Sequence, residues 1–281
     1  MSAQNARVAL VTGASSGIGE ATVERLLAQG FIVYAGARRV DRMAGIEQRG
    51  AHTLSLDVTD DQSMTDAVAQ ILTERNRIDV LVNNAGYGSY GSVEQVPLEE
   101  ARRQFEVNVF GLARLTQLVL PSMRERRSGR IINVSSIAGR IYEPLGAWYH
   151  ATKFAVEGLS DSLRLEVAPF GIDVTIIQPG PIRTEWNTIA RESMTAISGE
   201  GPYAGIARRM RATYEKIDGG RTAGTPEQVA EAIVRAATAR RPKTREAVPA
   251  SAKTIVTARR LLSDRAMDHV TRRILMGGSG R

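Results

Sequence analysis

The stretch RVALVTGASSGIG at residues 7–19 decides the fold of this chain. Its first half, residues 7–12, is an apolar run typical of a buried strand, and its last glycines open a predicted helix over residues 17–29. Glycines at such a turn let the backbone approach a pyrophosphate closely, and the free N–H groups of a helix N-terminus attract negative charge. The spacing Gly-x-x-x-Gly-x-Gly differs from the more common Gly-x-Gly-x-x-Gly, and a plain turn is the alternative. We expect a dinucleotide site here.

Further apolar runs alternate with helical patterns along the chain. Strands are predicted at residues 31–35, 52–56, 78–82, 130–134 and 171–177. Helices are predicted at about residues 60–75, 99–127 and 148–168. Strands that alternate with helices form a parallel sheet that is covered on both faces. The predicted fold class is therefore α/β, a Rossmann-type doubly wound parallel sheet with helices on both faces.

The alternation defines a single domain with a tail. Residues 1–245 are expected to form one Rossmann-type dinucleotide-binding and catalytic domain. Within it, the glycine-rich residues 186–224 interrupt the pattern and read as an irregular segment, and loops of that length are usually functional or mobile. Residues 246–281 are expected to form a basic helical C-terminal extension. A seventh strand near residues 245–248 is only weakly indicated.

Composition excludes several kinds of chemistry. The chain has 281 residues and no cysteine, which rules out disulfides, thiolate metal sites and a cysteine nucleophile. His52, His150 and His269 are too scattered for a local zinc motif, so no metal site is predicted. The polar N-terminus lacks a signal-peptide core, and no apolar run approaches the ~18 residues of a membrane span, so we expect a cytoplasmic protein.

The net charge of +7 is concentrated towards the C-terminus. From Arg208 onward, 17 Lys and Arg stand against 7 Asp and Glu. A basic tail contacts nucleic acid or a membrane in some proteins, but more often it is a solvated helix face. The solvated face is the favoured interpretation. No nucleic-acid partner is expected, because the chain has no recognition motif.

The end of the second strand indicates which dinucleotide is bound. NAD sites usually place an acid there to hold the ribose hydroxyls, but residues 34–39 read Tyr-Ala-Gly-Ala-Arg-Arg. A cation such as Arg38 pairs with the extra phosphate of NADP, and Ser15 adds a hydroxyl donor. The alternative is that Arg38 and Arg39 are merely exposed. We favour NADP.

Two other strand ends carry candidate cofactor contacts. Asp57 and Val58 follow the third strand and are placed to contact an adenine edge, although an acid there is equally a common helix cap. Residues 83–86, Asn-Asn-Ala-Gly, end the fourth strand, where small residues let a cofactor lie against the backbone. A strand-ending turn favours the same residues.

Tyr149 and Lys153 form a candidate proton-transfer pair. Positions i and i+4 share one helix face, so the phenol and the ammonium point the same way. A phenol has a pKa near ~10, and a nearby ammonium lowers it. Such a pair can exchange a proton with an alcohol or a ketone. Ser136 lies thirteen positions upstream of Tyr149. The spacing alone is weak evidence, because any amphipathic helix can contain it.

Together these motifs resemble those of the short-chain dehydrogenase/reductase family. Each is weak alone, and the set is highly specific. The matching pieces run in the family's order over about residues 7–185: Thr-Gly-x-x-x-Gly-x-Gly at 12–19, Asn-Asn-Ala-Gly at 83–86, Asn108, Ser136, Tyr149-x-x-x-Lys153, and Pro179-Gly180 with Thr184. The run at residues 84–91 also resembles the branch near hydroxysteroid and retinol dehydrogenases.

The resemblance implies four catalytic residues. Tyr149 is the general acid in reduction and the base in oxidation, while Lys153 lowers its pKa and hydrogen-bonds the nicotinamide ribose. Ser136 orients and polarises the substrate carbonyl, and the family's offset from the tyrosine selects it over Ser135. Asn108 holds a water that connects Lys153 to solvent.

The resemblance also implies the cofactor contacts. The Ile182 backbone and the Thr184 hydroxyl are expected to lie near the nicotinamide carboxamide. The alternative for residues 179–184 is a rigid turn into a helix with no binding role. The full set of expected NADP-binding residues is Gly13, Ser15, Ser16, Gly17, Ile18, Gly19, Arg38, Asp57, Val58, Asn84, Ala85, Gly86, Tyr149, Lys153, Pro179, Gly180, Ile182 and Thr184.

The implied activity is NADP(H)-dependent interconversion of a carbonyl and an alcohol, on a lipophilic ketone, aldehyde or secondary alcohol. Residues 186–224 take the place of the family's substrate lid. Candidate pocket walls are Trp186, Tyr203, the Met194 region, Tyr142, Leu145, Tyr87 and Tyr90. One rival interpretation is a cofactor-sensing regulatory protein on the same fold. The other is a nucleic-acid-binding protein, which only the pI of about 10.0 suggests.

The resemblance implies a homo-oligomer as well. The helices near residues 99–127 and 148–168 commonly form the interface in this family, so a homodimer or homotetramer is expected. The tail after residue 240 alternates apolar and cationic residues. It is expected to cap the active site, complete an interface or lie on a membrane surface, and the last of these is not favoured.

Overall fold

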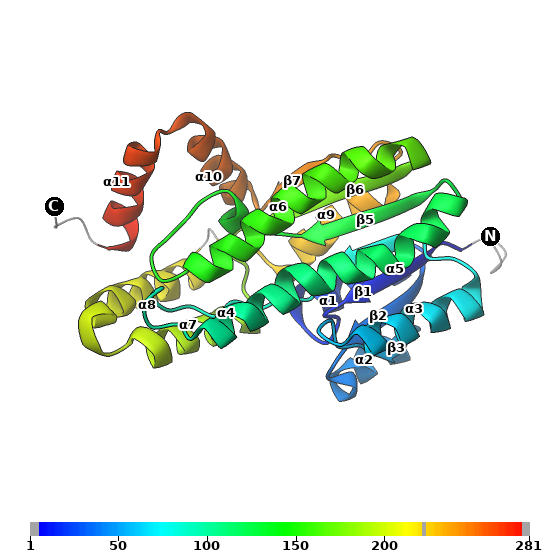
Figure 1. Ribbon diagram of the computed structural model, residues 1–281, viewed down its shortest axis with the longest axis horizontal. Coiled ribbons are helices and arrows are strands. Elements are labelled where there is room, and N and C mark those ends of the chain that lie inside the picture. Colours follow the sequence, from blue (N-terminus) through cyan, green and yellow to red (C-terminus); the bar gives the residue numbers. More distant parts are fainter. Residues whose placement is uncertain (1–5, 221–222, 277–281) are drawn as a thin grey trace.

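The computed structural model describes residues 6–220 and 223–276 and is shown in Figure 1. Its strands form one parallel sheet of seven, in the order β3-β2-β1-β4-β5-β6-β7. The strands are β1 (Val8–Thr12), β2 (Ile32–Ala37), β3 (His52–Ser55), β4 (Val80–Asn83), β5 (Gly129–Val134), β6 (Ile172–Pro179) and β7 (Arg245–Val248). The order reverses between β1 and β4, which is the doubly wound topology predicted from the sequence.

Helices cover both faces of the sheet because its strands are apolar on both sides. Along β1, Ala9 and Val11 enter one core while Val8 and Leu10 enter the other, as the two-residue period of a strand requires. The first core is closed by α1 (Gly17–Ala28), α2 (Ala44–Gln48) and α9 (Pro226–Thr238). The second is closed by α3 (Asp61–Arg75), α5 (Gly111–Glu125) and α6 (Ala147–Val167). The predicted α/β class is confirmed.

The long helix predicted near residues 99–127 is interrupted by a π-helical turn. It consists of α4 (Leu98–Phe105), the π turn at Glu106–Phe110, and α5. Asn108 lies in the middle of that turn and is buried. Such turns carry one extra residue per turn and are frequent at functional sites. The sequence predicted the helix but gave no sign of the turn.

The prediction that residues 186–224 are irregular is wrong. Two helices occupy most of this segment, α7 (Glu185–Ser198) and α8 (Ala204–Asp218), and they pack against each other. Gly199 and Gly219 are the C-caps of these helices, so they mark where a helix ends instead of preventing one. Met194 and Met210 are fully buried in the cluster that both helices share. In Figure 1 the pair lies at one end of the molecule, below α10 and α11.

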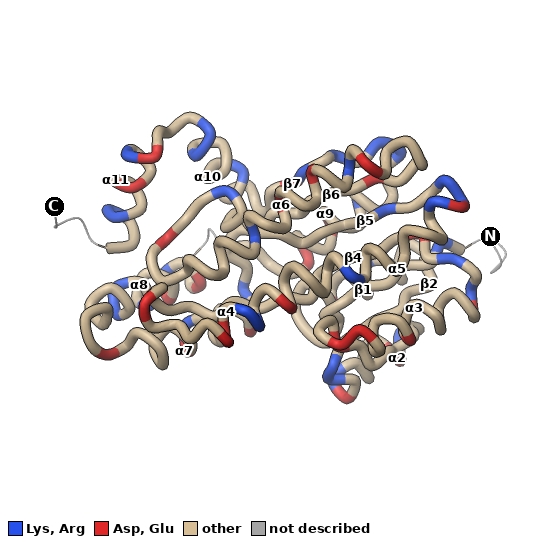
Figure 2. The backbone as a smooth tube through the Cα atoms, in the orientation of Figure 1, with Lys and Arg blue, Asp and Glu red and all other residues tan. Residues whose placement is uncertain are grey.

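The C-terminal residues complete the sheet before they leave it. The weakly indicated seventh strand is present, and β7 pairs with β6 in parallel. The predicted boundary after residue 245 therefore falls inside a strand. The chain then forms α10 (Ala250–Leu261) and α11 (Asp264–Leu275), whose Lys and Arg residues appear in Figure 2. The expectation for residues 277–281 lies outside the described residues.

Short helical turns complete the described elements. They are 3₁₀ segments at Val40–Met43, Ile137–Gly139, Ala168–Phe170 and Gly201–Tyr203. Of the helices in residues 6–220 and 223–276, none is long and apolar enough to cross a membrane.

Two glycines give opposite predictions for the same substitution. A Cβ on Gly19 would overlap the Gly13 carbonyl oxygen and come within 2.7 Å of Asn84 Nδ2, so Gly19→Ala should lower the free energy of unfolding by about 2–4 kcal/mol. Gly158 lies on the exposed face of α6 with nothing within 4 Å, so Gly158→Ala should raise it by about 0.5–1 kcal/mol. Urea denaturation of both variants measures this, and a Gly19→Ala protein as stable as the parent would contradict the packing.

Candidate active site

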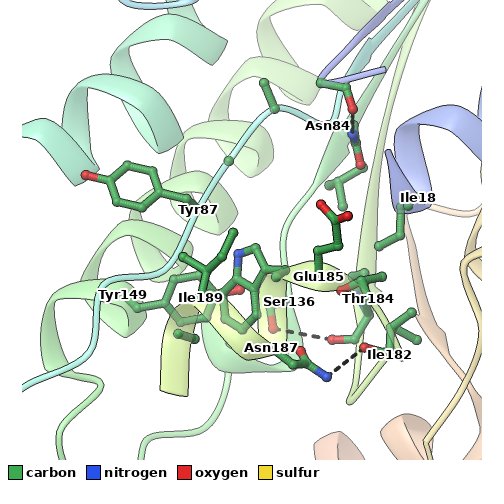
Figure 3. A pocket seen from close by; sticks show the side chains of 18 of the residues that line it. Ile18, Asn84, Tyr87, Ser136, Tyr149, Ile182, Thr184, Glu185, Asn187 and Ile189 are labelled. Carbon is green, nitrogen blue, oxygen red and sulfur yellow. Dashed lines mark hydrogen bonds between the residues drawn. The ribbon is translucent and has the colours of Figure 1, made fainter. Parts of the chain in front are cut away.

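A cavity of about 540 Å³ opens at the carboxyl ends of the strands, around the point where strand order reverses. Figure 3 shows it from close by, with Ile18 and Asn84 towards one end and Tyr149 and Ile189 towards the other. Of the predicted site residues, all but Gly19 and Asn108 line the cavity. Those two lie behind its wall. The tertiary structure therefore gathers residues that are spread over about 170 positions of sequence, from Gly13 to Thr184.

Hydrogen bonds from the end of β4 fix the conformation of the loop after β1. Gly13 has a φ of +66° and Gly17 a φ of +59°, values that disfavour other residues. Asn84 Nδ2 donates to the Thr12 and Gly13 carbonyls, at 3.0 and 3.2 Å. The backbone N–H groups of Asn84 and Ala85 both donate to Thr12 Oγ1 at 3.0 Å. Asn84 thus shapes the loop in addition to lining the cavity.

The geometry of this loop fits a dinucleotide. Ser16 is the N-cap of α1, and its side chain makes no capping hydrogen bond, so the first N–H groups of the helix face the cavity without that partner. A Cβ on Gly13 would come within 2.9 Å of Ala85 Cα, and one on Gly17 within 3.3 Å of Thr184 Cγ2. A side chain at either glycine would therefore meet the backbone of Ala85 or the side chain of Thr184, at the position where a pyrophosphate needs room and donors.

The end of β2 places two arginines at the mouth of the cavity. Arg38 and Arg39 are exposed, and Arg39 Nη2 donates to Ser15 Oγ at 3.4 Å. Arg103 on α4 also lines the cavity. Asp57 lines it as well, while its Oδ1 accepts from the Thr59 N–H and hydroxyl at 2.9 and 2.8 Å. The cap of α3 is Asp60, so the alternative that Asp57 caps a helix is wrong.

Ser136, and not Ser135, faces Tyr149. The Ser136 hydroxyl donates to the Pro179 carbonyl at 3.3 Å and accepts from the Ala138 N–H at 3.1 Å. It also lies close enough to Tyr149 to lower the pKa of the phenol. Ser135 Oγ is buried and has no hydrogen-bond partner among the described residues. The offset that favoured Ser136 in the sequence therefore agrees with the geometry.

Burial governs the protonation of Tyr149 and Lys153. Both side chains are 7% exposed. Burial raises the pKa of the Tyr149 phenol above its ordinary value, the Ser136 hydrogen bond partly opposes this, and the Glu143 carboxylate adds to it. Burial lowers the pKa of Lys153 to about 8, and Glu157 partly opposes that. Burial therefore sets the direction, and the pKa of Tyr149 is raised, where the sequence predicted that Lys153 would lower it.

Lys153 is fixed by the strand beside it. Its Nζ donates to the Val134 carbonyl at 3.0 Å and lies 5.8 Å from the centroid of the Tyr149 ring. Both residues come from one face of α6, as the i, i+4 spacing predicted. Glu157, one turn further along, forms ion pairs with Arg140 at 2.9 Å and Arg245 at 2.8 Å. The charge nearest to Lys153 on its own helix is therefore already compensated.

The Asn108 side chain hydrogen-bonds both backbone polar groups of Tyr87. Its Nδ2 donates to the Tyr87 carbonyl at 2.8 Å and to Thr152 Oγ1 at 3.1 Å, and its Oδ1 accepts from the Tyr87 N–H at 3.0 Å. A Cβ on Gly86 would come within 2.9 Å of Asn108 Oδ1. The π turn places the amide at this position. Its expected role in holding a water stays a prediction.

The far half of the cavity differs from the predicted pocket. Tyr87, Tyr90 and Trp186 line it as expected. The other four candidates do not line it. Leu145 and Met194 pack behind the wall, the Tyr203 hydroxyl binds Glu94 at 2.7 Å, and the Tyr142 hydroxyl binds Asp268 at 3.0 Å.

Several lining residues carried no sequence signal. They are Glu143, His150, Ile189, Ala190, Arg191, Tyr214 and Asp218. Most of them come from α7 and α8, which the sequence did not predict as helices. Without those helices, nothing in the local pattern places these side chains beside Tyr149. Among residues 6–220 and 223–276, no three His, Asp or Glu side chains gather in a way that suits a metal ion.

A glycine loop at the switch point of a doubly wound sheet, with Ser136 and the buried Tyr149 and Lys153 beside it, defines an oxidoreductase that uses a nucleotide cofactor. Comparison with known proteins agrees. The model of the short chain dehydrogenase family matches residues 7–195. The chain belongs to the short-chain dehydrogenase/reductase family.

Individual relatives are similar over nearly the whole chain. A 3-ketodihydrosphingosine reductase of Bacteroides thetaiotaomicron is 38% identical, over 86% of this chain and 87% of its own. An NADPH-dependent 3-dehydrocapnine reductase of Ornithobacterium rhinotracheale is 37% identical, over 94% and 95%. The crystal structure of a short-chain dehydrogenase from Streptomyces avermitilis is 38% identical, covers 99% of this chain and all of its own, and has a TM-score of 0.82.

The buried ammonium of Lys153 should lower the free energy of unfolding of the protein. Because the folded-state pKa of about 8 lies below the ordinary 10.5, the protonated lysine opposes folding below pH 8, and this effect disappears as pH rises towards 10.5. Lys153→Met should therefore raise the free energy of unfolding at pH 7 by about 1–3 kcal/mol, less at pH 10. Denaturant unfolding at both pH values measures this.

The matched control is Lys216→Met on the exposed face of α8, which should change stability by less than about 0.5 kcal/mol. A Lys153→Met protein that is less stable than the parent at pH 7 would contradict the assignment of a costly buried charge.

Proposed function

We propose that this protein is an NADP(H)-dependent oxidoreductase that interconverts a carbonyl and an alcohol on a lipophilic ketone, aldehyde or secondary alcohol. The observation that carries the proposal is the position of Ser136 and Tyr149 together in the wall of the cavity, with Lys153 beside them. A cofactor bound along the glycine loop supplies the hydride chemistry.

The side chains supply the proton and the orientation. The Tyr149 phenol is protonated at neutral pH, because burial raises its pKa, so it can donate a proton to a carbonyl oxygen in reduction. Ser136 Oγ donates a second hydrogen bond to the same oxygen once it exchanges its present partner, the Pro179 carbonyl. Lys153 adds positive charge, which favours the phenolate left after proton transfer. Asn108 holds residues 86–87 in place, and we assign it the water-mediated link to solvent.

NADP is the proposed cofactor because of the charge at the end of β2. Arg38, Arg39 and Ser15 stand together there and suit a phosphate on the ribose. Among the residues of β2 and the turn that follows it, none up to Arg39 is acidic. A relative described as NADPH-dependent supports this choice.

The lipophilic substrate is proposed from the walls of the far half. Trp186, Ile189 and Ala190 on α7 line this half together with Tyr87 and Tyr90, and the Trp186 ring meets the Tyr90 ring edge-on with centroids 6.2 Å apart. A lid role for residues 186–224 remains a proposal that rests on α7 and α8 covering this end. The two relatives described as reductases of 3-keto and 3-dehydro compounds support the carbonyl chemistry. A purely regulatory protein would not need Ser136, Tyr149 and Lys153 together.

The proposed assembly is a homodimer or homotetramer through α4–α5 and α6. Phe110 and Phe154 are 55% and 47% exposed on these helices, which pack together around Val109, Leu112 and Val156. Large exposed aromatic side chains are typical of protein interfaces.

Tyr149→Phe should abolish turnover and leave cofactor binding intact. The variant removes the proton donor without changing the ring, and acid–base catalysis typically contributes ~10²–10⁴-fold to the rate. NADPH oxidation with a panel of ketones and aldehydes gives kcat, and fluorescence titration gives the Kd for NADPH. Tyr203→Phe is the control, because its hydroxyl binds Glu94 outside the cavity. Turnover near that of the parent in Tyr149→Phe would refute the mechanism.

Arg38→Asp should reverse the cofactor preference. The substitution replaces a phosphate partner with a carboxylate that suits the ribose hydroxyls, so kcat/KM should fall about 10- to 100-fold with NADPH and rise with NADH. Arg208→Asp, on the exposed face of α8 outside the cavity, makes the same charge change and should leave the ratio unchanged. A parent enzyme that prefers NADH would overturn the NADP assignment.

A further inference from the structure

His150 follows Tyr149 on α6 and is buried between two hydrogen-bond acceptors. Its Nδ1 lies 2.9 Å from the Ala138 carbonyl oxygen, and its Nε2 lies 3.7 Å from Glu143 Oε1. A carbonyl oxygen only accepts hydrogen bonds, so Nδ1 carries a proton. A lone pair on Nε2 would face a carboxylate, so a second proton is favoured there. The geometry therefore favours an imidazolium in an ion pair with Glu143.

The Glu143 carboxylate is the counter-ion of this ring and the meeting point of several elements. It lies in the loop before α6, and the Tyr90 hydroxyl, from the loop after β4, donates to its Oε1 at 3.1 Å. Burial raises the pKa of the Glu143 carboxyl, but His150 and the hydroxyls of Tyr214 and Tyr90 outweigh burial and lower it. The ion pair therefore connects α6 with α8 and the loop after β4, in the wall of the substrate half.

On the other side of the ring, Ala138 connects His150 to Ser136. Ala138 belongs to the 3₁₀ turn at Ile137–Gly139, whose N-cap is Ser136, and its N–H donates to Ser136 Oγ at 3.1 Å. Because Oγ accepts this bond, its own proton points to another acceptor, at present the Pro179 carbonyl at 3.3 Å. The proposed mechanism gives that proton to the substrate oxygen. A ring that holds the Ala138 carbonyl therefore helps to orient Ser136.

Three phenols and one ammonium also titrate near this ion pair. Burial raises the pKa of Tyr90, Tyr149 and Tyr214, so these phenols are neutral around pH 7. Lys153, whose pKa burial lowers to about 8, lies one turn further along α6 and donates to β5. Burial lowers the pKa of the imidazole, but the carboxylate and the backbone carbonyl beside it outweigh burial and raise it. The charge of the pair near neutral pH therefore depends on the imidazole.

We propose that protonated His150 is a positioning residue, which holds the turn that orients Ser136 towards the substrate oxygen, with Glu143 as its counter-ion. This inference rests on the proposed function, because it concerns the same reaction. Loss of the Nε2 proton sets a lone pair against the carboxylate, and the repulsion displaces the ring from Ala138. Because the pKa of His150 is raised in the folded protein, the arrangement is complete below the ordinary pKa of histidine and is lost as pH rises through the raised value.

Histidine nitrogen NMR tests the ion pair without any turnover. The chain has three histidines, and His52→Gln and His269→Gln, both at exposed positions, identify the His150 signal by elimination. At pH 6.5, the ordinary pKa of histidine, both ring nitrogens of His150 should carry a proton in most molecules. Glu143→Gln should lower the titration midpoint, because the counter-ion is removed. A ring that is mostly neutral at pH 6.5 would overturn the proposal, as would a midpoint that Glu143→Gln leaves unchanged.

His150→Gln tests the effect on the reaction. With NADPH and the carbonyl compound of the panel that the parent reduces fastest, kcat should fall about 10- to 100-fold, because the Ser136 hydrogen bond to the reacting oxygen is misdirected. The Kd for NADPH should change by less than about twofold. The kcat of the parent should also fall with rising pH at the NMR midpoint of His150, and this step should be absent from the variant. If the variant does not fold, the parent's step and midpoint decide: agreement supports the role, and disagreement overturns it.

His269→Gln is also the matched kinetic control, because it makes the same exchange on the exposed face of α11, outside the cavity. It should leave kcat and the pH profile unchanged. A His150→Gln enzyme with the kcat of the parent, or with an alkaline step at the same pH, would overturn the positioning role and leave the proposed reaction standing. A protonated His150 in a protein that reduces no carbonyl of the panel would confirm the ion pair and overturn the positioning role together with the proposed reaction.

Discussion

The hydrogen bonds between the end of β4 and the loop after β1 are the constraint on which the rest of the site depends. Thr12 Oγ1 accepts two backbone N–H groups from residues 84–85, and Asn84 Nδ2 donates back to the Thr12 and Gly13 carbonyls. These bonds join the two strands at the point where strand order reverses. They hold the loop in the left-handed conformation that Gly13 and Gly17 adopt. The direction of the first helix, and with it the position of its N–H groups, follows from this contact.

A second constraint is the burial of the reacting groups. Lys153 and Tyr149 sit where water is largely excluded, so the ammonium is less basic and the phenol less acidic than in water. Such an arrangement opposes folding, and it makes each charge more effective towards a bound molecule. The surrounding structure stabilises it through polar bonds between neighbouring elements. Asn133 accepts from Asn83 at 2.9 Å and donates to Ser160 at 2.9 Å, which fixes β4, β5 and α6 behind the site.

The cavity has two halves with different chemistry. The half along the glycine loop offers backbone donors and arginines, which suits phosphates. The half under α7 and α8 is lined mainly by aromatic and apolar side chains such as Trp186, Ile189 and Tyr90, which suits an apolar molecule. Ser136 and Tyr149 lie between them. Local sequence patterns do not predict these two halves, because Glu143, Tyr90 and Tyr214 come from three separate segments.

The sequence by itself determined the sheet, the glycine loop and the Ser136, Tyr149 and Lys153 set, because each depends on local patterns: apolar strands, glycines at a turn, and a spacing of four on a helix. Tertiary structure decided the rest. It formed the two helices α7 and α8, whose apolar faces are recognisable only against Tyr90 and Leu145. It placed a π turn at Asn108, and it set the pKa values of Tyr149 and Lys153 through burial, where the sequence suggested only their mutual attraction. It also brought Glu143 to the wall of the cavity. Burial and long-range packing depend on residues far apart in the chain, so no local sequence pattern predicts them.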